Sequence, residues 1–181
     1  MLSKQDILEA IKKGELSIEP FIDDNLGPDS LDVRLGNKLL VSRNINKVID
    51  PKNPVNYWER IEISKGFMLM PGQFILGSTI ERLSLGRNIA AQIEGRSSIG
   101  RLGIMVHVTA GVIHAGFGIK EPSSVTLEIY SVNPNPVMIY PGMKIAQLAF
   151  FRLEHGVEKG YDEIKGSKYT NQKEPLPPKP I

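Results

Sequence analysis

The chain has 181 residues, no cysteine and a formal net charge of +2, from 22 basic and 20 acidic residues. This length favours one domain that buries enough surface to fold without disulfides or metals. The lack of cysteine excludes a disulfide framework, a thiolate nucleophile and a cysteine-ligated zinc. Balanced charge does not favour nucleic-acid binding, and no apolar run reaches the roughly 20 residues of a membrane span. The charged N-terminus is unlike a secretory signal, so we expect a cytoplasmic protein.

One short helix is expected at the N-terminus, between Ser3 as its N-cap and Gly14. Beyond it, short apolar or alternating segments are separated by glycine and proline at a spacing near ten residues, which is typical of an all-β sandwich or barrel. The expected strands cover residues 30–36, 39–41, 61–63, 67–70, 74–80, 89–93, 104–108, 125–132, 137–140 and 145–153. A short helical turn is expected within 97–103.

Two segments, 67–78 and 137–148, each place Pro-Gly between apolar stretches, and we interpret them as two similar hairpins with type II turns. The sequence from Gly156 onward is polar and proline-rich, which predicts a flexible arm outside the core. The expected organisation is therefore a β domain over 1–155, followed by an arm over 156–181.

The segment 95–107, GRSSIGRLGIMVH, is the strongest cluster of possible ligand-binding residues. Arginine and serine offer donors for phosphate oxygens, and glycine lets the backbone approach closely. The segment does not match the GxxxxGK[ST] phosphate loop. Composition alone favours a charged loop around a glycine turn.

Glu128 lies in an alternating strand, on the face opposite Leu127. Such a carboxylate usually faces water; the functional alternative is a general base at a cavity wall. The histidines, at positions 107, 114 and 155, have no metal-ligand spacing. Without H-x-E and P-C-x-x-C elements, a zinc-dependent base deaminase is excluded. The arm, with Tyr161, Lys168 and Gln172, is either a disordered terminus or a lid over a charged ligand.

Four elements occur in order along the chain: GRSSIGRLGIMVHVTAGVI, VTLEIY, YPGMKIAQLAF and SKYTNQ. Together they resemble the dCTP deaminase family of the dUTPase-like superfamily, over about residues 1–172. The resemblance implies a distorted, jelly-roll-like β-barrel of the dUTPase type and a homotrimer with active sites at subunit interfaces. It also implies dCTP as the substrate, with Mg²⁺ carried by its triphosphate and no zinc or other protein-bound metal.

Residue by residue, Glu128 matches the family's catalytic glutamate, which activates a water for attack on C4 of cytosine and moves protons. Ser97 and Arg101 match residues that orient the water and the base, whereas Arg96 and Ser98 suit phosphate oxygens. The nucleotide-binding residues that the resemblance implies are Arg96, Ser97, Ser98, Ile99, Gly100, Arg101, Ala110, His114, Thr126, Leu127, Glu128, Gln147, Tyr161, Lys168 and Gln172. The last three residues, Tyr161, Lys168 and Gln172, lie in the arm and would close over the sugar and the triphosphate.

His114 departs from the family pattern, because this position usually carries an aspartate that contacts the sugar or, in dUTPases, holds the hydrolytic water. A further departure is an apparent insertion in the loop 118–124. TAG at 109–111 and Gln147 resemble members that convert dCTP to dUMP, but His114 occupies the hydrolytic position itself. The leading expectation is therefore deamination of dCTP to dUTP and ammonia, which would supply dUMP and dTTP synthesis.

Three alternatives stay open at this point. A bifunctional enzyme would release dUMP and pyrophosphate instead of dUTP. A regulator of the same fold would bind nucleotides without turnover. A purely structural β-rich subunit would require the motifs of 95–107 and of the arm to be coincidental.

Overall fold

The computed structural model describes residues 1–181. Helix α1 (Lys4–Lys12) begins as expected at Ser3, whose side chain accepts a hydrogen bond from the Asp6 amide, while the Asp6 carboxylate accepts one from the Ser3 amide. This reciprocal capping satisfies two of the amides left free at a helix start. The helix ends before Gly14, whose φ of +70° suits glycine. Neither helix of the fold is long and apolar enough to cross a membrane.

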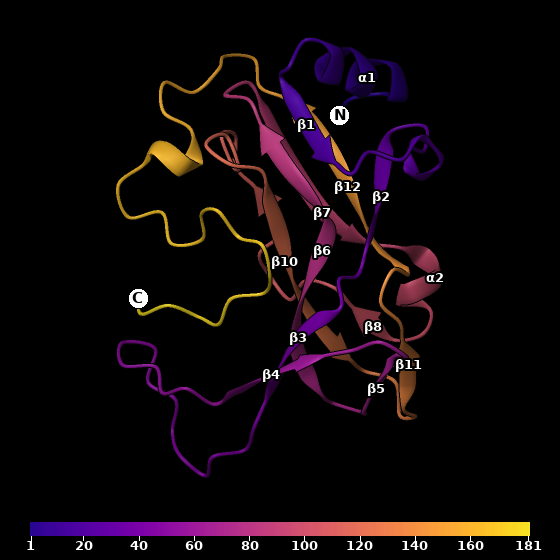
Figure 1. The fold of residues 1–181 in the computed structure, drawn as a ribbon, viewed down its shortest axis with the longest axis vertical. Helices are drawn as coiled ribbons and strands as arrows, with labels where there is room; N and C mark the ends of the chain where they lie inside the picture. The colour runs from indigo at the N-terminus through magenta and orange to yellow at the C-terminus, as the bar shows by residue number, and fades with distance from the viewer.

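The first sheet is built around one long strand, β6 (Phe74–Leu85). Its strand order is β4 (Trp58–Glu62), β3 (Lys38–Ser42), β6, β10 (Ser123–Ser131) and β8 (Ile104–Met105), and β1 (Leu16–Glu19) pairs with the far half of β6. Because β6 has 12 residues, it contacts β3 near its start and β1 near its end, with β10 along its other edge. Figure 1 shows β6 and β10 running through the centre of the molecule.

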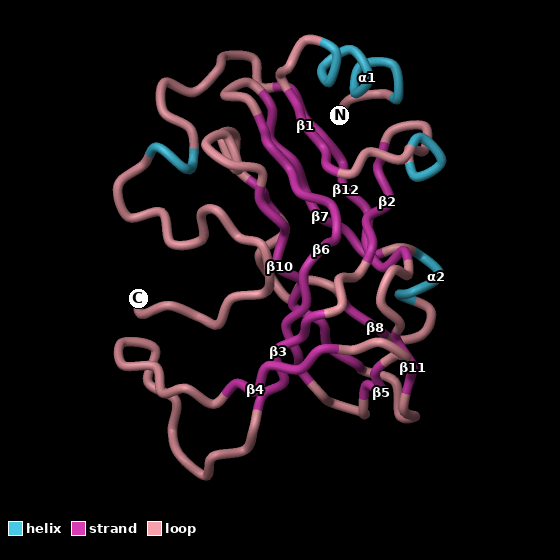
Figure 2. The backbone as a smooth tube through the Cα atoms, viewed as in Figure 1, coloured by secondary structure: helices cyan, strands magenta, loops and turns pink.

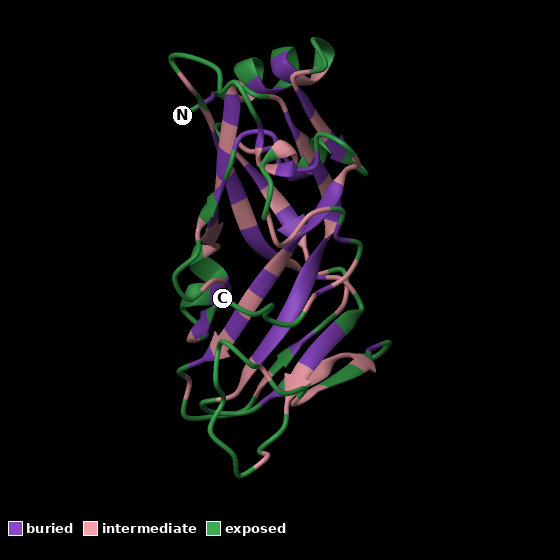
Figure 3. Ribbon diagram, turned by 90° about the vertical axis from the view of Figure 1, so that its left-hand side faces the viewer, coloured by how far each residue is buried: buried purple, intermediate pink, exposed green.

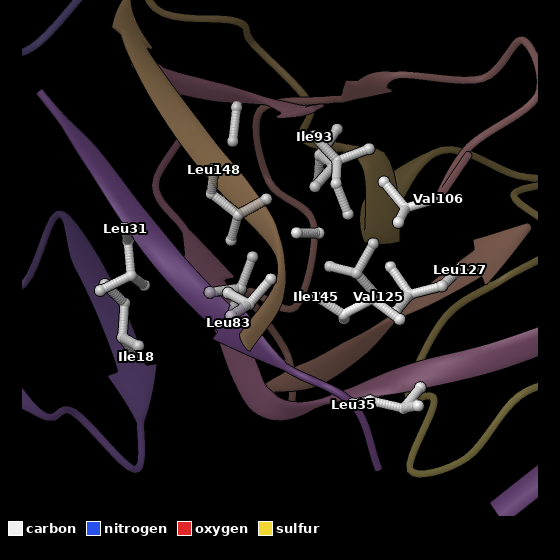
Figure 4. Close-up of a cluster of buried hydrophobic side chains, with 14 of the residues drawn as sticks. Ile18, Leu31, Leu35, Leu83, Ile93, Val106, Val125, Leu127, Ile145 and Leu148 are labelled. Atoms are coloured by element: carbon white, nitrogen blue, oxygen red, sulfur yellow. The ribbon is translucent and has the colours of Figure 1, made fainter. Parts of the chain in front are cut away.

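The second sheet has the order β2 (Ser30–Arg34), β12 (Lys144–Arg152), β7 (Ile89–Gly95) and β9 (Val112–Ile113). Alternating side chains from both sheets meet in one core of 31 buried apolar residues, which includes Leu31 and Leu148 of this sheet and Leu83 and Val125 of the first (Figure 4). An isolated bridge between Leu35 and Thr79 joins the two sheets at one edge. The mainly β fold expected from the sequence is confirmed, as a distorted two-layered structure with open sheets (Figure 2).

The two expected hairpins are wrong, although their turns are real. Gly72 and Gly142 have φ values of +69° and +81°, as a type II turn requires. The strands before the turns, β5 (Phe67–Leu69) and β11 (Val137–Ile139), pair with each other and not with the strands that follow. Each Pro-Gly turn therefore connects a strand of the small two-stranded sheet to a strand of a large sheet. The first leads from β5 to β6, and the second leads from β11 to β12.

Three short elements complete the fold: α2 (Ser97–Gly100), which confirms the expected helical turn, and the 3-10 turns η1 (Asp23–Asn25) and η2 (Tyr161–Glu163). From Gly156 the chain forms no strand and runs over the surface of the body (Figure 1). Exposed residues dominate the loops, whereas the strands are largely buried (Figure 3). Within the arm, however, Asp162 and Gln172 are each only 5% exposed.

Candidate active site

A cavity of about 420 Å³ lies between the sheet that contains β10 and the C-terminal arm. It is lined mainly by apolar and aromatic side chains, including Trp58 and Phe74 on the sheet, and Tyr169 and Leu176 on the arm. Six of the residues expected to bind a nucleotide line it: Ala110, His114, Thr126, Glu128, Tyr161 and Gln172. Enclosed apolar walls with few polar groups are typical of small-molecule sites.

Glu128 is the only carboxylate in the lining of this cavity. The alternation of β10 buries Leu127 in the core and turns Glu128 to the opposite face. One carboxylate oxygen, Oε2, accepts a hydrogen bond of 2.9 Å from the amide of Val108. No protein group donates to Oε1. The carboxylate is thus oriented through one oxygen and can bind water or substrate through the other.

The arm is attached to β10 through Gln172. Its side-chain Oε1 accepts a hydrogen bond of 2.9 Å from the Thr126 hydroxyl, and its carbonyl oxygen accepts one of 2.8 Å from the amide of Ser124. On the other side of the cavity, the rings of His114 and Tyr161 are stacked, with centroids 5.9 Å apart and planes at 14°. The arm therefore covers the face of β10 that carries Glu128.

A second cavity, of about 720 Å³, lies beneath the arm and shares His114 and Tyr161 with the first. Lys159, Lys165 and Lys168 line it, and its lining contains no Asp or Glu. None of the three lysines forms an ion pair, unlike Lys173, whose ammonium lies 2.7 Å from Glu121. Uncompensated positive charge around a cavity favours a polyanion. Of these lysines, only Lys168 was predicted from the sequence to bind a nucleotide. The basic character of the arm was the only feature that could have indicated the other two.

The segment 96–101 lies apart from Glu128 within the chain. Ser97, Ser98 and Arg101 are exposed, and none of 96–101 lines either cavity. Arg96 donates to Asp32 at 2.8 Å and to the carbonyl of Lys144 at 3.3 Å. The segment lies apart from Glu128 because it directly follows β7, a strand of the second sheet, whereas Glu128 lies on β10 of the first sheet.

The remaining expected contacts also lie apart from the cavity. The side chain of Ile99 is buried in the core, where it anchors α2, and Gly100 is exposed at its end. The Gln147 side chain donates to the carbonyl of Gly95, at the base of the same segment. Within one chain, the expected site is therefore divided into a Glu128 half and an Arg101 half.

Comparison with known proteins identifies the family. The model of the dCTP deaminase-like family matches residues 1–153. A protein of Dictyoglomus thermophilum named "dCTP deaminase, dUMP-forming" is 44% identical, over 97% of this chain and 92% of that protein. A protein of Corynebacterium diphtheriae with the same name is 41% identical, over 99% of this chain and 96% of that protein.

Among solved structures, the 2′-deoxycytidine 5′-triphosphate deaminase from Agrobacterium tumefaciens matches 85% of this chain with a TM-score of 0.63 and 26% identity. The match covers 48% of the Agrobacterium chain, so this chain spans about half of that length. These matches confirm the family predicted from the sequence motifs, and with it the prediction of an enzyme. The chain belongs to the dCTP deaminase-like family.

Proposed function

We propose that the protein deaminates dCTP and cleaves the resulting triphosphate, so that dCTP and two waters yield dUMP, ammonia and pyrophosphate. The observation that carries this proposal is a pair of adjacent cavities that share lining residues. One holds Glu128 among apolar and aromatic side chains, and the other holds three unpaired lysines. A ligand with a flat heterocycle at one end and a polyanion at the other fits both. His114 and Tyr161, shared by the two cavities, would then lie beside the sugar.

In the deamination step, Glu128 would take a proton from a water that attacks C4 of the cytosine ring. The same carboxyl group would pass protons to N3 and to the departing amino group, which leaves as ammonia. Its hydrogen bond to the Val108 amide fixes the orientation of the carboxylate before the reaction begins. The ring of the substrate would lie between β10 and the aromatic side chains of the cavity.

The triphosphate would lie in the lysine-lined cavity as its Mg²⁺ complex. Lys159, Lys165 and Lys168 would neutralise charge that the magnesium leaves uncompensated. No group of three His, Cys, Asp or Glu side chains is arranged to hold a metal ion. We assign Mg²⁺ to the triphosphate of the substrate, as the family resemblance implies.

The name dUMP-forming, shared by the relatives at 41–44% identity, supports the bifunctional reaction over release of dUTP. The initial expectation of dUTP as the final product is thus not confirmed. His114, at the boundary between the two cavities, has one nitrogen that can accept and one that can donate a hydrogen bond when neutral. It can hold a water near the phosphate next to the sugar, as the family's aspartate would.

A second copy of the chain would supply the missing half of the site. The Glu128 cavity has no Arg or Lys in its lining, whereas the Arg101 guanidinium makes no contact with an acidic partner in its own chain. Leu102, Met105 and Val132 are exposed apolar residues in or next to the segment that follows Arg101, since the Val132 amide donates to the carbonyl oxygen of Gly103. We propose that this surface packs against a neighbouring subunit in a homotrimer, and brings Ser97 and Arg101 to its Glu128.

The test is product analysis after incubation with dCTP and Mg²⁺. We expect ammonia and pyrophosphate in equal amounts, and neither from Glu128→Gln, which keeps the shape of the side chain but removes the base. Glu154→Gln, on an exposed unpaired glutamate, is the matched control. Ammonia with accumulating dUTP would reject the second step alone. Tight nucleotide binding without any ammonia would reject both steps and support the regulator alternative.

A further inference from the structure

The loop 118–122, directly before β10, holds the C-terminal arm at two points. The Lys120 ammonium donates to the carbonyl oxygen of Asp162 at 2.7 Å, and the Glu121 carboxylate lies 2.7 Å from the ammonium of Lys173. Between these points, residues 163–172 form the part of the arm that carries Lys168 and Gln172. We propose that Lys120 and Glu121 are positioning residues that keep the arm closed over the cavities through protein contacts alone.

The loop is a fixed support, because its backbone has little freedom. Gly118 has a φ of +69°, and a Cβ at this position would lie 1.9 Å from the carbonyl oxygen of Leu83. At the other end of the loop, the hydroxyl of Ser123, which is fully buried, donates to the carbonyl oxygen of Glu121. Lys120 and Glu121 therefore lie in a closely packed turn directly before β10, the strand that carries Thr126 and Glu128.

Near the first contact point, the backbone just before the loop crosses closely over the start of the arm. A Cβ on Gly116 would lie 2.2 Å from the Cα of Gly160, and the Tyr161 amide donates to the carbonyl oxygen of Ala115 at 2.8 Å. The next residue, Asp162, is 5% exposed, and neither of its carboxylate oxygens has a hydrogen-bond partner in the protein.

A buried carboxylate is unfavourable unless positive charge or donors lie close to it. Lys120 is the cation that contacts this residue, through the carbonyl oxygen. Removing the ammonium would therefore take away a charge-assisted hydrogen bond to the backbone of the arm at this buried residue. For this reason we expect Lys120 to be the stronger of the two contacts.

The second contact point fixes the arm next to Gln172. The side chains of Glu121 and Lys173 are 43% and 63% exposed, so solvent screens their attraction. Lys173 nevertheless lowers the pKa of Glu121 below its ordinary value. Because Lys173 follows Gln172 directly, this pair also limits the movement of the amide that contacts Thr126.

The experiment compares Lys120→Met, Glu121→Gln and the exchanged pair E121K/K173E. In protein without nucleotide, we measure by mass spectrometry how fast trypsin cleaves after Lys165 and Lys168. We expect about tenfold faster cleavage for Lys120→Met, as loss of a charge-assisted hydrogen bond implies, and about twofold for Glu121→Gln. The exchanged pair and Lys120→Arg should return to the rate of the unaltered protein.

Lys13→Met is the matched control, because it removes an exposed ion pair with Glu9 of α1 that includes no residue of the arm. It should leave the cleavage rate unchanged. Thermal unfolding of every variant separates local release of the arm from global destabilisation. Cleavage at the unaltered rate in Lys120→Met, with the fold intact, would overturn the proposal.

Kinetics give a second measurement, which rests on the proposed function. Lys120→Met should raise the KM for dCTP about tenfold and change kcat little, because the chemistry at Glu128 is not altered. A loss of kcat at constant KM would contradict a positioning role. The cleavage assay requires no turnover, so failure of the proposed function and failure of this inference give different results.

Discussion

The cavity at Glu128 and the exposed turn at Arg101 are two unlike parts of the molecule that the sequence motifs join in one site. The first is enclosed by the arm and contains a carboxylate but no cation in its lining. The second lies on the surface, where Arg101 and its neighbouring serines lack polar partners for their side chains, whereas Arg96 is paired with Asp32. Each part lacks the groups that the other presents. This difference supports assembly of the site between two copies of the chain.

The largest expected effect comes from combining two inactive variants. Arg101→Ala and Glu128→Gln should each lower ammonia release more than about 100-fold, as loss of a charge-stabilising donor or a general base does. Trimers formed from both variants in equal amounts should recover about a quarter of the activity, because one site in four receives both intact residues. The mixed protein is made by co-expression with two different tags. A mixture as inactive as its components would place the two residues in separate functions.

His114 distinguishes the two steps of the proposed reaction. His114→Ala should lower pyrophosphate release about 100-fold and leave most ammonia release, so that dUTP accumulates. The physical reason is that the imidazole lines both cavities, whereas Glu128, which would activate the water that attacks the ring, lines only the first. His155→Ala, at an exposed position outside both cavities, is the control. Parallel loss of both products would instead assign His114 to binding.

The lysine-lined cavity predicts a smaller effect, confined to binding. Lys159→Met and Lys165→Met should each raise the KM for dCTP about tenfold, because each removes one unpaired charge facing the triphosphate. Binding of dCMP, which lacks the outer phosphates, should change much less. Lys47→Met removes an exposed lysine outside both cavities and should leave binding unchanged. Equal losses for dCTP and dCMP would argue against phosphate binding in this cavity.

The smallest effect concerns the attachment of the arm at low pH. The Arg87 guanidinium, with help from the Gly160 amide, lowers the pKa of Glu163 from 4.5 to about 2. Because the pKa is lower in the folded state, the contribution of Glu163 is present above its ordinary pKa and is lost as the pH falls towards about 2. Arg87→Gln should raise the pKa of Glu163 towards its ordinary value, as measured by NMR titration. An unchanged pKa would show that Arg87 does not hold Glu163 in solution.

Much of the local structure could be predicted from the sequence. Ser3, Asp6 and Gly14 bound a helix because capping and positive φ depend on residues close in the chain. The alternation around Glu128 predicted which side chains of β10 enter the core. The strands β1 and β9 were missed, because four and two residues are too few to show a period.

The pairing of strands could not be read from local patterns. The Pro-Gly turns at Gly72 and Gly142 have the geometry of hairpin turns, yet β5 and β11 pair across 60 or more residues of chain. A turn fixes the direction of the chain, whereas packing of whole sheets decides the partner of each strand. Local patterns also could not single out Lys159 and Lys165, because only the folded arm brings them to the lining of one cavity.

The amino-acid sequence by itself determined the family, the mainly β class and the face of its strand on which Glu128 lies, because these follow from short motifs and from the period of two along a strand. The tertiary structure decided where those motifs meet. It put Glu128 under an arm held by Gln172, and set the turn at Arg101 on another face of the same chain. Such placement depends on contacts between residues far apart in the sequence, which no local pattern encodes.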